Sequence, residues 1–236
     1  MDGSVQITEQ GGMCLTFDDW FVKNWFRARS LFLEHNARCT FYIARPDKLR
    51  TGQIDRLKQL AEDGHEIGFH TTNHSRITKF LRDRTLADYL RVEIDAGLAM
   101  MKFIGFRPVT FSYPYHRRTD ESDAELLKRF KILRYRHPAK NRNARLVKPG
   151  TAQVVNILGS LDMTGENRDI GFYERRFNLV KKQKAFGVLC GHNIGDKGRA
   201  LVQDGKRAFI SIPDLERVLI AGTERGIRFE PVRALI

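Results

Sequence analysis

Short runs of apolar residues alternate along this chain with longer stretches in which apolar residues recur every three or four positions. The short runs have the length of buried strands, and the longer stretches have the periodicity of amphipathic helices. We predict strands at residues 12–17, 38–44, 65–69, 108–111, 132–135, 153–158, 186–190 and 227–229. We predict helices at residues 21–35, 53–63, 86–104, 120–130, 173–184 and 213–226.

Strands and helices alternate throughout, an order typical of a mostly parallel sheet with helices outside it. A basic stretch at residues 137–150 is predicted to be a long loop. No internal repeat or linker divides the sequence, and no apolar run has the length of a membrane span. Residues 1–236 are therefore expected to form a single α/β domain.

Four of the predicted strands are followed by short polar segments that contain turn-forming and chemically reactive residues. These segments are Asp18–Asp19, His70–His74, Ser112–Tyr115 and Gly191–Asn193. The active sites of parallel α/β folds lie at the carboxyl ends of the strands. The sequence therefore predicts one site assembled from four distant parts of the chain.

A metal site is the first chemistry that these segments suggest. His70 and His74 are spaced i and i+4, which places both imidazoles on one side of a helical turn. With the Asp19 carboxylate they leave a coordination position for water, as in an open catalytic zinc site. Another divalent transition metal would accept the same ligands. The alternative is that both histidines form only local hydrogen bonds in a turn, but the neighbouring carboxylates favour a metal.

Three other residues are candidates for proton transfer and charge stabilisation. Asp18 is available as a general base if Asp19 binds the metal, unless Asp18 caps the helix that follows. His192 emerges at the same edge, where an imidazole with a pKa of about 6.5 suits protonation of a leaving amine. A lone histidine there is as often structural. Pro114 fixes the backbone before Tyr115, whose N–H is a candidate donor to an oxyanion.

The charge balance bears on the partners of the protein. The net charge is +13, and residues 128–148 contain nine lysines and arginines without an acidic residue between them. A second basic group lies at residues 175–184. Such groups are typical of proteins that bind nucleic acids, anionic membranes or anionic glycans, and equally of a solvated basic face.

The cysteines and the first residues bear on the compartment. Cys14, Cys39 and Cys190 all lie in apolar, strand-like runs, which favours free thiols over a disulfide framework. The first ten residues lack the basic start and apolar core of a secretion signal. Together these features predict a cytoplasmic protein.

The site segments together resemble motifs of the polysaccharide deacetylase family, also called the NodB homology domain or carbohydrate esterase family 4. The family's TFDDG motif is similar to Thr16–Trp20, and its GHEIGNHT motif with a further histidine is similar to Gly64–His74. Its RxPY motif resembles Ser112–Tyr115, and its LxLH motif resembles Leu189–His192. The similarity covers most of the chain.

This resemblance implies a distorted (β/α) barrel with about seven parallel strands. It implies Asp18 as the catalytic base and His192 as the general acid. It also implies Asp19, His70 and His74 as zinc ligands. We predict substrate contacts from Trp20, Tyr113, Pro114 and Tyr115.

Three departures from the family pattern affect these expectations. Ser112 stands where the family has an arginine that steadies the catalytic aspartate, so the tuning of Asp18 must come from elsewhere. Trp20 replaces a glycine beside the metal, where it narrows the site or offers a stacking face for a sugar. In the region of the family's fourth motif, residues 158–167, only Asp162 is present, without the accompanying tryptophan.

We therefore predict a zinc-dependent deacetylase that removes acetyl groups, N-linked rather than O-linked, from a carbohydrate or glycoconjugate. The basic surplus is compatible with an anionic substrate, although charge alone names no partner. One rival is an O-acetyl esterase, or a hydrolase of non-sugar amides, on the same scaffold. Another is a binding module that uses residues 134–148 to hold an anionic glycan or nucleic acid, although nucleic acid is not the expected partner.

Overall fold

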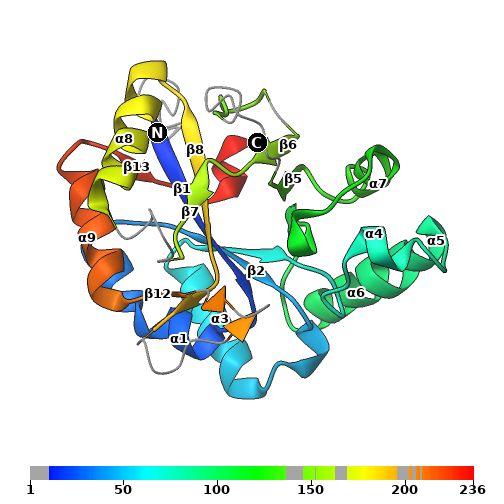
Figure 1. Ribbon diagram of the computed structural model, residues 1–236. Helices are drawn as coiled ribbons and strands as arrows, with labels where there is room; N and C mark the ends of the chain where they lie inside the picture. Colours follow the sequence, from blue (N-terminus) through cyan, green and yellow to red (C-terminus); the bar gives the residue numbers. More distant parts are fainter. Residues whose placement is uncertain are drawn as a thin grey trace, which may run out of the picture.

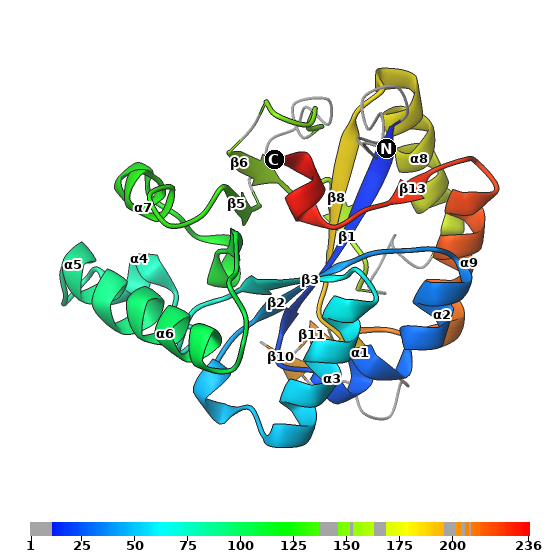
Figure 2. The ribbon, with the colours of Figure 1, turned by 180° about the vertical axis from the view of Figure 1, so that it is seen from behind.

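The computed structural model describes residues 11–136, 146–151, 153–162, 169–195, 202–203, 206–207 and 209–236 (Figures 1 and 2). Its strands are β1 (Gly12–Asp19), β2 (Thr40–Ile43), β3 (Glu66–Phe69), β4 (Thr110–Ser112), β5 (Ile132–Tyr135), β6 (Val154–Asn156), β7 (Gly159–Ser160), β8 (Phe186–Gly191), β9 (Asn193–Ile194), β10 (Val202–Gln203), β11 (Lys206–Arg207), β12 (Phe209–Ile210) and β13 (Arg228–Phe229). Its α-helices are α1 (Val22–Arg27), α2 (Arg29–Glu34), α3 (Thr51–Glu62), α4 (Ile77–Phe80), α5 (Leu86–Tyr89), α6 (Ala96–Phe103), α7 (Asp120–Leu126), α8 (Ile170–Gln183) and α9 (Ile212–Thr223).

Parallel strands form the central sheet in the order β6-β5-β4-β3-β2-β1-β8-β7, with β13 also paired to β1. The two strands at the ends of this path, β6 and β7, are separated in sequence by only Ile157 and Leu158. The Ile157 N–H donates to Tyr135 O in β5 at 3.1 Å, and the Leu158 N–H donates to Val188 O in β8 at 2.8 Å. This bent segment joins the two ends of the sheet, so β6 and β7 share one position in a distorted (β/α) barrel.

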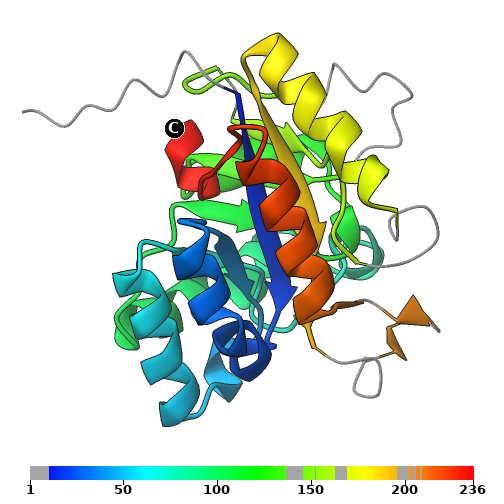
Figure 3. The same ribbon diagram turned by 90° about the vertical axis from the view of Figure 1, so that its left-hand side faces the viewer.

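Helices pack outside the strands, as the alternating pattern predicted. Helices α8 and α9 pack against each other beside β1 and β8, and α1 and α3 pack together beyond β2 and β3 (Figures 2 and 3). Side chains of β1 and β2 fill the space between sheet and helices, where the Phe41 ring lies 5.1 Å from Trp25 and 6.1 Å from Phe32. Cys14, Cys39 and Cys190 are buried free thiols. No helix within the described ranges is long and apolar enough to cross a membrane.

All the predicted strands are present, but two predicted helices differ from the structure. The helix expected at residues 21–35 is divided at Ala28 into α1 and α2. The helix expected at residues 86–104 contains a π-helical segment, Leu90–Asp95, between α5 and α6. Most of the loop predicted at residues 137–150 lies outside the described residues.

Candidate active site

The carboxyl ends of β1 and β3 bring three predicted metal ligands together. Asp19 ends β1, and His70 and His74 follow β3. Asp19 Oδ1 lies 3.2 Å from His74 Nε2 and 3.8 Å from His70 Nε2. All three side chains are buried.

These three side chains fit a small divalent metal ion. Two ligand atoms bound at about 2.0–2.2 Å to one tetrahedral ion lie about 3.3 Å apart, close to the separations seen here. Asp19 Oδ1 is also buried without a hydrogen-bond partner among the described residues. An unpaired buried oxygen is costly, and a bound cation would remove that cost.

Both histidines favour the neutral form that binds metals. Burial lowers the pKa of His70 and lowers that of His74 to about 3. His70 Nδ1 lies 2.7 Å from the carbonyl oxygen of Ser112. Because a carbonyl only accepts hydrogen bonds, Nδ1 carries the proton and the lone pair of Nε2 faces Asp19.

A buried carboxylate fastens the loop that carries His74. Glu93 accepts hydrogen bonds from the Asn73 N–H at 2.9 Å and from Ser75 Oγ at 2.6 Å, and its main-chain carbonyl accepts from the Thr72 N–H at 2.9 Å. Glu93 lies in the π-helical segment, and π turns free backbone carbonyls for such external partners. Sequence reasoning missed Glu93 because its helical spacing resembles that of any surface residue.

The backbone of the site is strained at the residues that meet there. Positive φ angles occur at Asp19 (89°), Thr71 (71°), His74 (61°), Tyr115 (55°) and His116 (56°). Each such angle costs a side-chain-bearing residue about 1 kcal/mol or more. Strain concentrated at strand ends is typical of functional sites, where the surrounding fold holds side chains in place.

Asp18 is held by a buried arginine from a neighbouring strand. Arg134 Nη2 donates to both carboxylate oxygens of Asp18, at 2.6 and 2.5 Å, and also contacts Ser112 Oγ. Arg134 and Ser112 are in-register neighbours on β5 and β4. Position 112 is a serine instead of the family's arginine, and Arg134 supplies a guanidinium from the neighbouring strand.

The position of Arg134 corrects the expectation that it belongs to a binding surface and agrees with the expectation that another residue tunes Asp18. Arg134 was grouped with the basic residues of a binding surface, but its side chain is fully buried and ion-paired. Burial alone would raise the pKa of Asp18, but Arg134, followed by nearby histidines, outweighs burial and holds that pKa below its ordinary value. Asp18 is therefore ionised at neutral pH.

His192 is paired with a carboxylate that the sequence indicated only weakly. Its Nδ1 lies 2.7 Å from Asp162 Oδ2, and its N–H donates to Asp162 Oδ1 at 3.1 Å. Burial opposes the charged imidazolium, but Asp162, with smaller contributions from Asp18 and Asp19, raises the pKa of His192 to about 9. The only sequence signal for this pair was the position of Asp162 in the expected motif.

Asp18, Cys190 and His192 form a second group with metal-ligating atoms close together. Asp18 is already bound by the Arg134 guanidinium, and His192 Nδ1 by Asp162. Burial also raises the pKa of the Cys190 thiol, which disfavours the thiolate that a metal requires. This group is therefore less suited to bind a metal than the group of Asp19, His70 and His74.

The predicted substrate-contacting residues divide into two pairs. Tyr113 and Pro114 are buried, and Tyr113 Oη donates to Asp123 at 2.6 Å, so these side chains support the loop instead of facing a substrate, contrary to the prediction. Tyr115 is 43% exposed and its ring lies 4.9 Å from that of His74. Trp20 meets His74 edge-on at 5.9 Å. The rings of Trp20 and Tyr115 thus both lie against His74.

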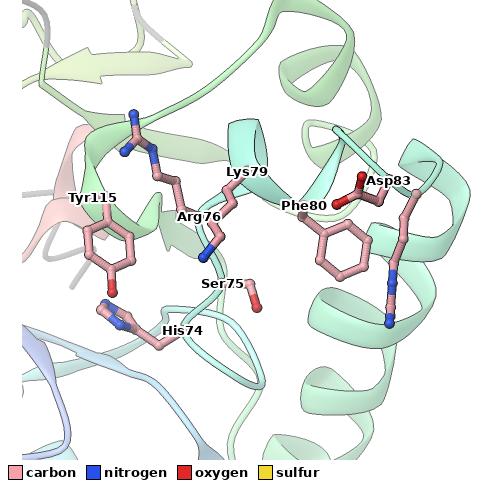
Figure 4. Close-up of a pocket in the computed structure, with 8 residues that line it drawn as sticks. His74, Ser75, Arg76, Lys79, Phe80, Asp83 and Tyr115 are labelled. Atoms are coloured by element: carbon pink, nitrogen blue, oxygen red, sulfur yellow. The ribbon is translucent and has the colours of Figure 1, made fainter.

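A pocket of about 540 Å³ opens beside His74 and Tyr115 (Figure 4). Its other lining residues follow His74 in sequence, before, along and after α4: Ser75, Arg76, Lys79, Phe80, Asp83 and Arg84. The volume is typical of a site for a small ligand.

Comparisons with known proteins agree with this architecture. The sequence model of the family "Polysaccharide deacetylase" matches residues 6–133, more than half of the chain. A search of curated proteins finds no match.

Several solved structures share the fold. The peptidoglycan deacetylase PdaC from Bacillus subtilis has 15% identity and a TM-score of 0.60, covering 97% of this chain and 91% of its own. The chitin deacetylase from the fungal pathogen Colletotrichum lindemuthianum has 15% identity and a TM-score of 0.61, covering 97% and 88%. The Xyl-CE4 domain of a multidomain xylanase from the hindgut metagenome of Trinervitermes trinervoides has 12% identity and a TM-score of 0.60, covering 96% and 89%.

Proposed function

Because this chain belongs to the polysaccharide deacetylase family, we propose that it is a zinc-dependent hydrolase that removes N-acetyl groups from a carbohydrate or glycoconjugate. One observation carries this proposal. Asp19, with a buried oxygen that has no hydrogen-bond partner among the described residues, lies with the neutral His70 and His74. Beside them lie the ionised Asp18 and the protonated His192. This set of side chains supplies a metal site, a base and an acid at one edge of the barrel.

Asp19, His70 and His74 would hold the metal. When bound, the ion supplies Lewis acidity that polarises a carbonyl and lowers the pKa of water. The proposed choice of zinc rests on the two imidazoles and one carboxylate, a ligand set that zinc accepts with one position open. The basic net charge of +13 further favours a substrate that carries negative charge.

Asp18 is proposed to accept a proton from the attacking water. Arg134 keeps its carboxylate ionised and fixes its orientation through hydrogen bonds to both oxygens. Asp18 and His192 have polar atoms within 4.8 Å of each other, so base and acid face the same small space. A positioned base contributes about 10²–10⁴-fold to such a reaction.

His192 is proposed to protonate the leaving nitrogen. An amine leaves far less readily than an alkoxide without a proton, so an acid that stays protonated at neutral pH favours an amide over an ester substrate. Tyr115 follows Pro114 in a short 3-10 helix, and its N–H is proposed to donate to the developing oxyanion.

Two neighbouring aspartates provide the test. Asp19→Ala should lose both bound zinc and acetate release, whereas Asp18→Asn should retain zinc and lower kcat by about 10²-fold or more. Zinc content is measured by mass spectrometry, and acetate release is measured on N-acetylated chito-oligosaccharides, acetylated xylan and a simple acetamide. Asp55→Asn, an exposed carboxylate on α3, is the matched control.

An Asp18→Asn protein with a normal rate of acetate release would refute the proposal that Asp18 is the general base. Faster release of acetate from acetylated xylan than from the chito-oligosaccharides would indicate an O-acetyl esterase instead of an N-deacetylase.

A further inference from the structure

We propose that the pocket beside His74 is a subsite for an anionic group, a phosphate or carboxylate, on the acetylated sugar; this inference rests on the proposed function and adds the substrate class. The pocket has a volume of about 540 Å³, with His74, a proposed metal ligand, on one side and Phe80 and Asp83 on the other. A ligand in it would therefore be continuous with the reacting acetyl group.

The view into the pocket shows how its walls are arranged (Figure 4). The hydroxyl end of Tyr115 is directed toward His74 at one end, and Phe80 and Asp83 lie at the other end. The side chain of Lys79 lies between these ends, and that of Arg76 extends over Tyr115 at the first end. A sugar that spans the pocket would pass both cations.

The side chains that line the pocket carry more positive than negative charge. Three cations, Arg76, Lys79 and Arg84, share it with one carboxylate, Asp83. None of these four groups forms an ion pair with another residue in the described part of the chain. Uncompensated guanidinium and ammonium groups in a concave site attract and hold anions.

Several basic residues elsewhere on the surface are neutralised by a carboxylate, unlike those that line the pocket. Arg29 pairs with Asp63 at 2.6 Å, and Arg129 pairs with Asp95 at 2.7 Å. Lys128 pairs with Glu125 at 2.6 Å. The pocket is thus a place where positive charge is concentrated and left available beside the active site.

A further arginine and two aromatic rings support binding of a charged sugar. Arg45 lies over the Trp20 ring at 4.6 Å, and Trp20 in turn meets the His74 ring edge-on. Arg84 lies over Phe80 at 5.2 Å, which leaves the edge of the guanidinium free for planar, bidentate contact with phosphate or carboxylate. Tyr115 and Phe80 offer apolar faces for sugar rings.

The double variant Arg76→Gln/Lys79→Gln tests the subsite in the zinc-loaded protein. The substrates are N-acetylglucosamine, its 1-phosphate and 6-phosphate, and N-acetylmuramic acid, which carries a carboxylate. We expect kcat/KM for at least one anionic sugar to exceed that for the neutral sugar by about tenfold at low salt. The double variant should reduce this ratio to near one, whereas Lys58→Gln, an exposed lysine on α3, should leave it unchanged.

Calorimetric binding of the same sugars separates the two proposals. If no sugar releases acetate, the proposed function fails, and the subsite is judged by tighter binding of the anionic sugars that the double variant abolishes. Equal kcat/KM and equal affinity for neutral and anionic sugars would overturn the subsite alone. A preference for anionic sugars that persists in the double variant would indicate that the anion binds the metal. That result would also overturn the proposed subsite.

Discussion

Asp18 and Asp19 are neighbours in sequence, yet their surroundings prepare them for opposite tasks. Asp19 departs from the strand conformation with a φ of 89°, and only Asp18 meets Arg134, although one oxygen of each carboxylate lies 3.8 Å from His70 Nε2. Burial raises the pKa of Asp19, and His70 and His192 offset this only in part. Asp18 thus has a fixed cation, which suits the proposed role of base, whereas Asp19 lacks one and suits the proposed role of metal ligand. Residue type alone does not separate the two roles.

The pair Asp162–His192 gives a prediction at this scale. Asp162→Asn removes the carboxylate that raises the pKa of His192 to about 9, so that pKa should fall toward its ordinary value of about 6.5. Because the proposed acid must be protonated, the alkaline limb of the pH profile of kcat/KM should move to lower pH by roughly two units. Acetate release at pH 8.5 should fall at least tenfold, and much less at pH 6. Coinciding alkaline limbs in the two proteins would argue against His192 as the acid.

At the scale of elements, the register of β4 and β5 decides how the site is built. Arg134 and Ser112 are paired across these strands, and both contact Asp18. Adjacent strands lie only about 4.8 Å apart, so a guanidinium at either position can reach the same carboxylate. The π-helical segment has a similar effect on β3, because its Glu93 fixes the loop that carries His74.

An exchange of the two residues tests this account. Arg134→Ser should lower kcat by about 10²-fold and destabilise the protein by about 3 kcal/mol, because it leaves Asp18 as an unpaired buried charge. The double variant Ser112→Arg/Arg134→Ser returns a guanidinium to Asp18 and should recover much of both losses, measured by acetate release and urea unfolding.

Arg176→Ser, which removes another buried arginine, is the matched control, and Ser112→Arg should not rescue it. A double variant no better than Arg134→Ser would show that the position of Arg134, and not only its charge, is required.

Hydrophobic periodicity and residue propensity predicted nearly every long helix and strand, but not the irregularities within the helices. Burial periodicity is a local property, so residues 86–104 were correctly expected to be helical. The π-helical segment within them is hydrogen-bonded to Thr72 and Ser75, which lie in the loop between β3 and α4. Asp162 lay in the expected region, but its pairing with His192 depends on how β7 and β8 align.

At the scale of the whole molecule, a polar layer at the opposite end of the strands ties the barrel together. Buried Glu66 accepts hydrogen bonds from Thr110 Oγ1 at 2.6 Å, Thr40 Oγ1 at 2.8 Å and the Arg233 N–H at 2.9 Å. These bonds link β2, β3, β4 and the C-terminal segment. Next to it, buried His65 accepts the Cys39 N–H at 2.9 Å through Nδ1.

His65 should make the stability of the protein depend on pH. Burial lowers the pKa of His65 to about 4, against about 6.5 in the unfolded chain. Between these values the unfolded chain binds the extra proton, so the contribution of neutral His65 is present above pH 6.5 and is lost as pH falls toward 4. Near pH 4.5 this loss amounts to about 2–3 kcal/mol.

Urea unfolding at pH 7 and pH 4.5 measures the effect. His65→Asn keeps a side-chain acceptor but does not titrate, and the charges around it, Asp63, Arg233, Arg38 and Arg29, are unchanged. Its free energy of unfolding should therefore fall by about 2–3 kcal/mol less than that of the wild type between these pH values. An equal fall in both proteins would show that His65 is not the group responsible.

The sequence by itself determined the alternation of strands and helices, the parallel sheet and the four polar segments at strand ends, including Asp19, His70 and His74. Local sterics and the periodicity of burial specify these features, and both are legible in short stretches of chain. Only the tertiary structure decided that Arg134 holds Asp18, that Asp162 pairs with His192, that Glu93 anchors the His74 loop and that residues 157–158 join the ends of the sheet. These partners are far apart in sequence, and strand register brings them together.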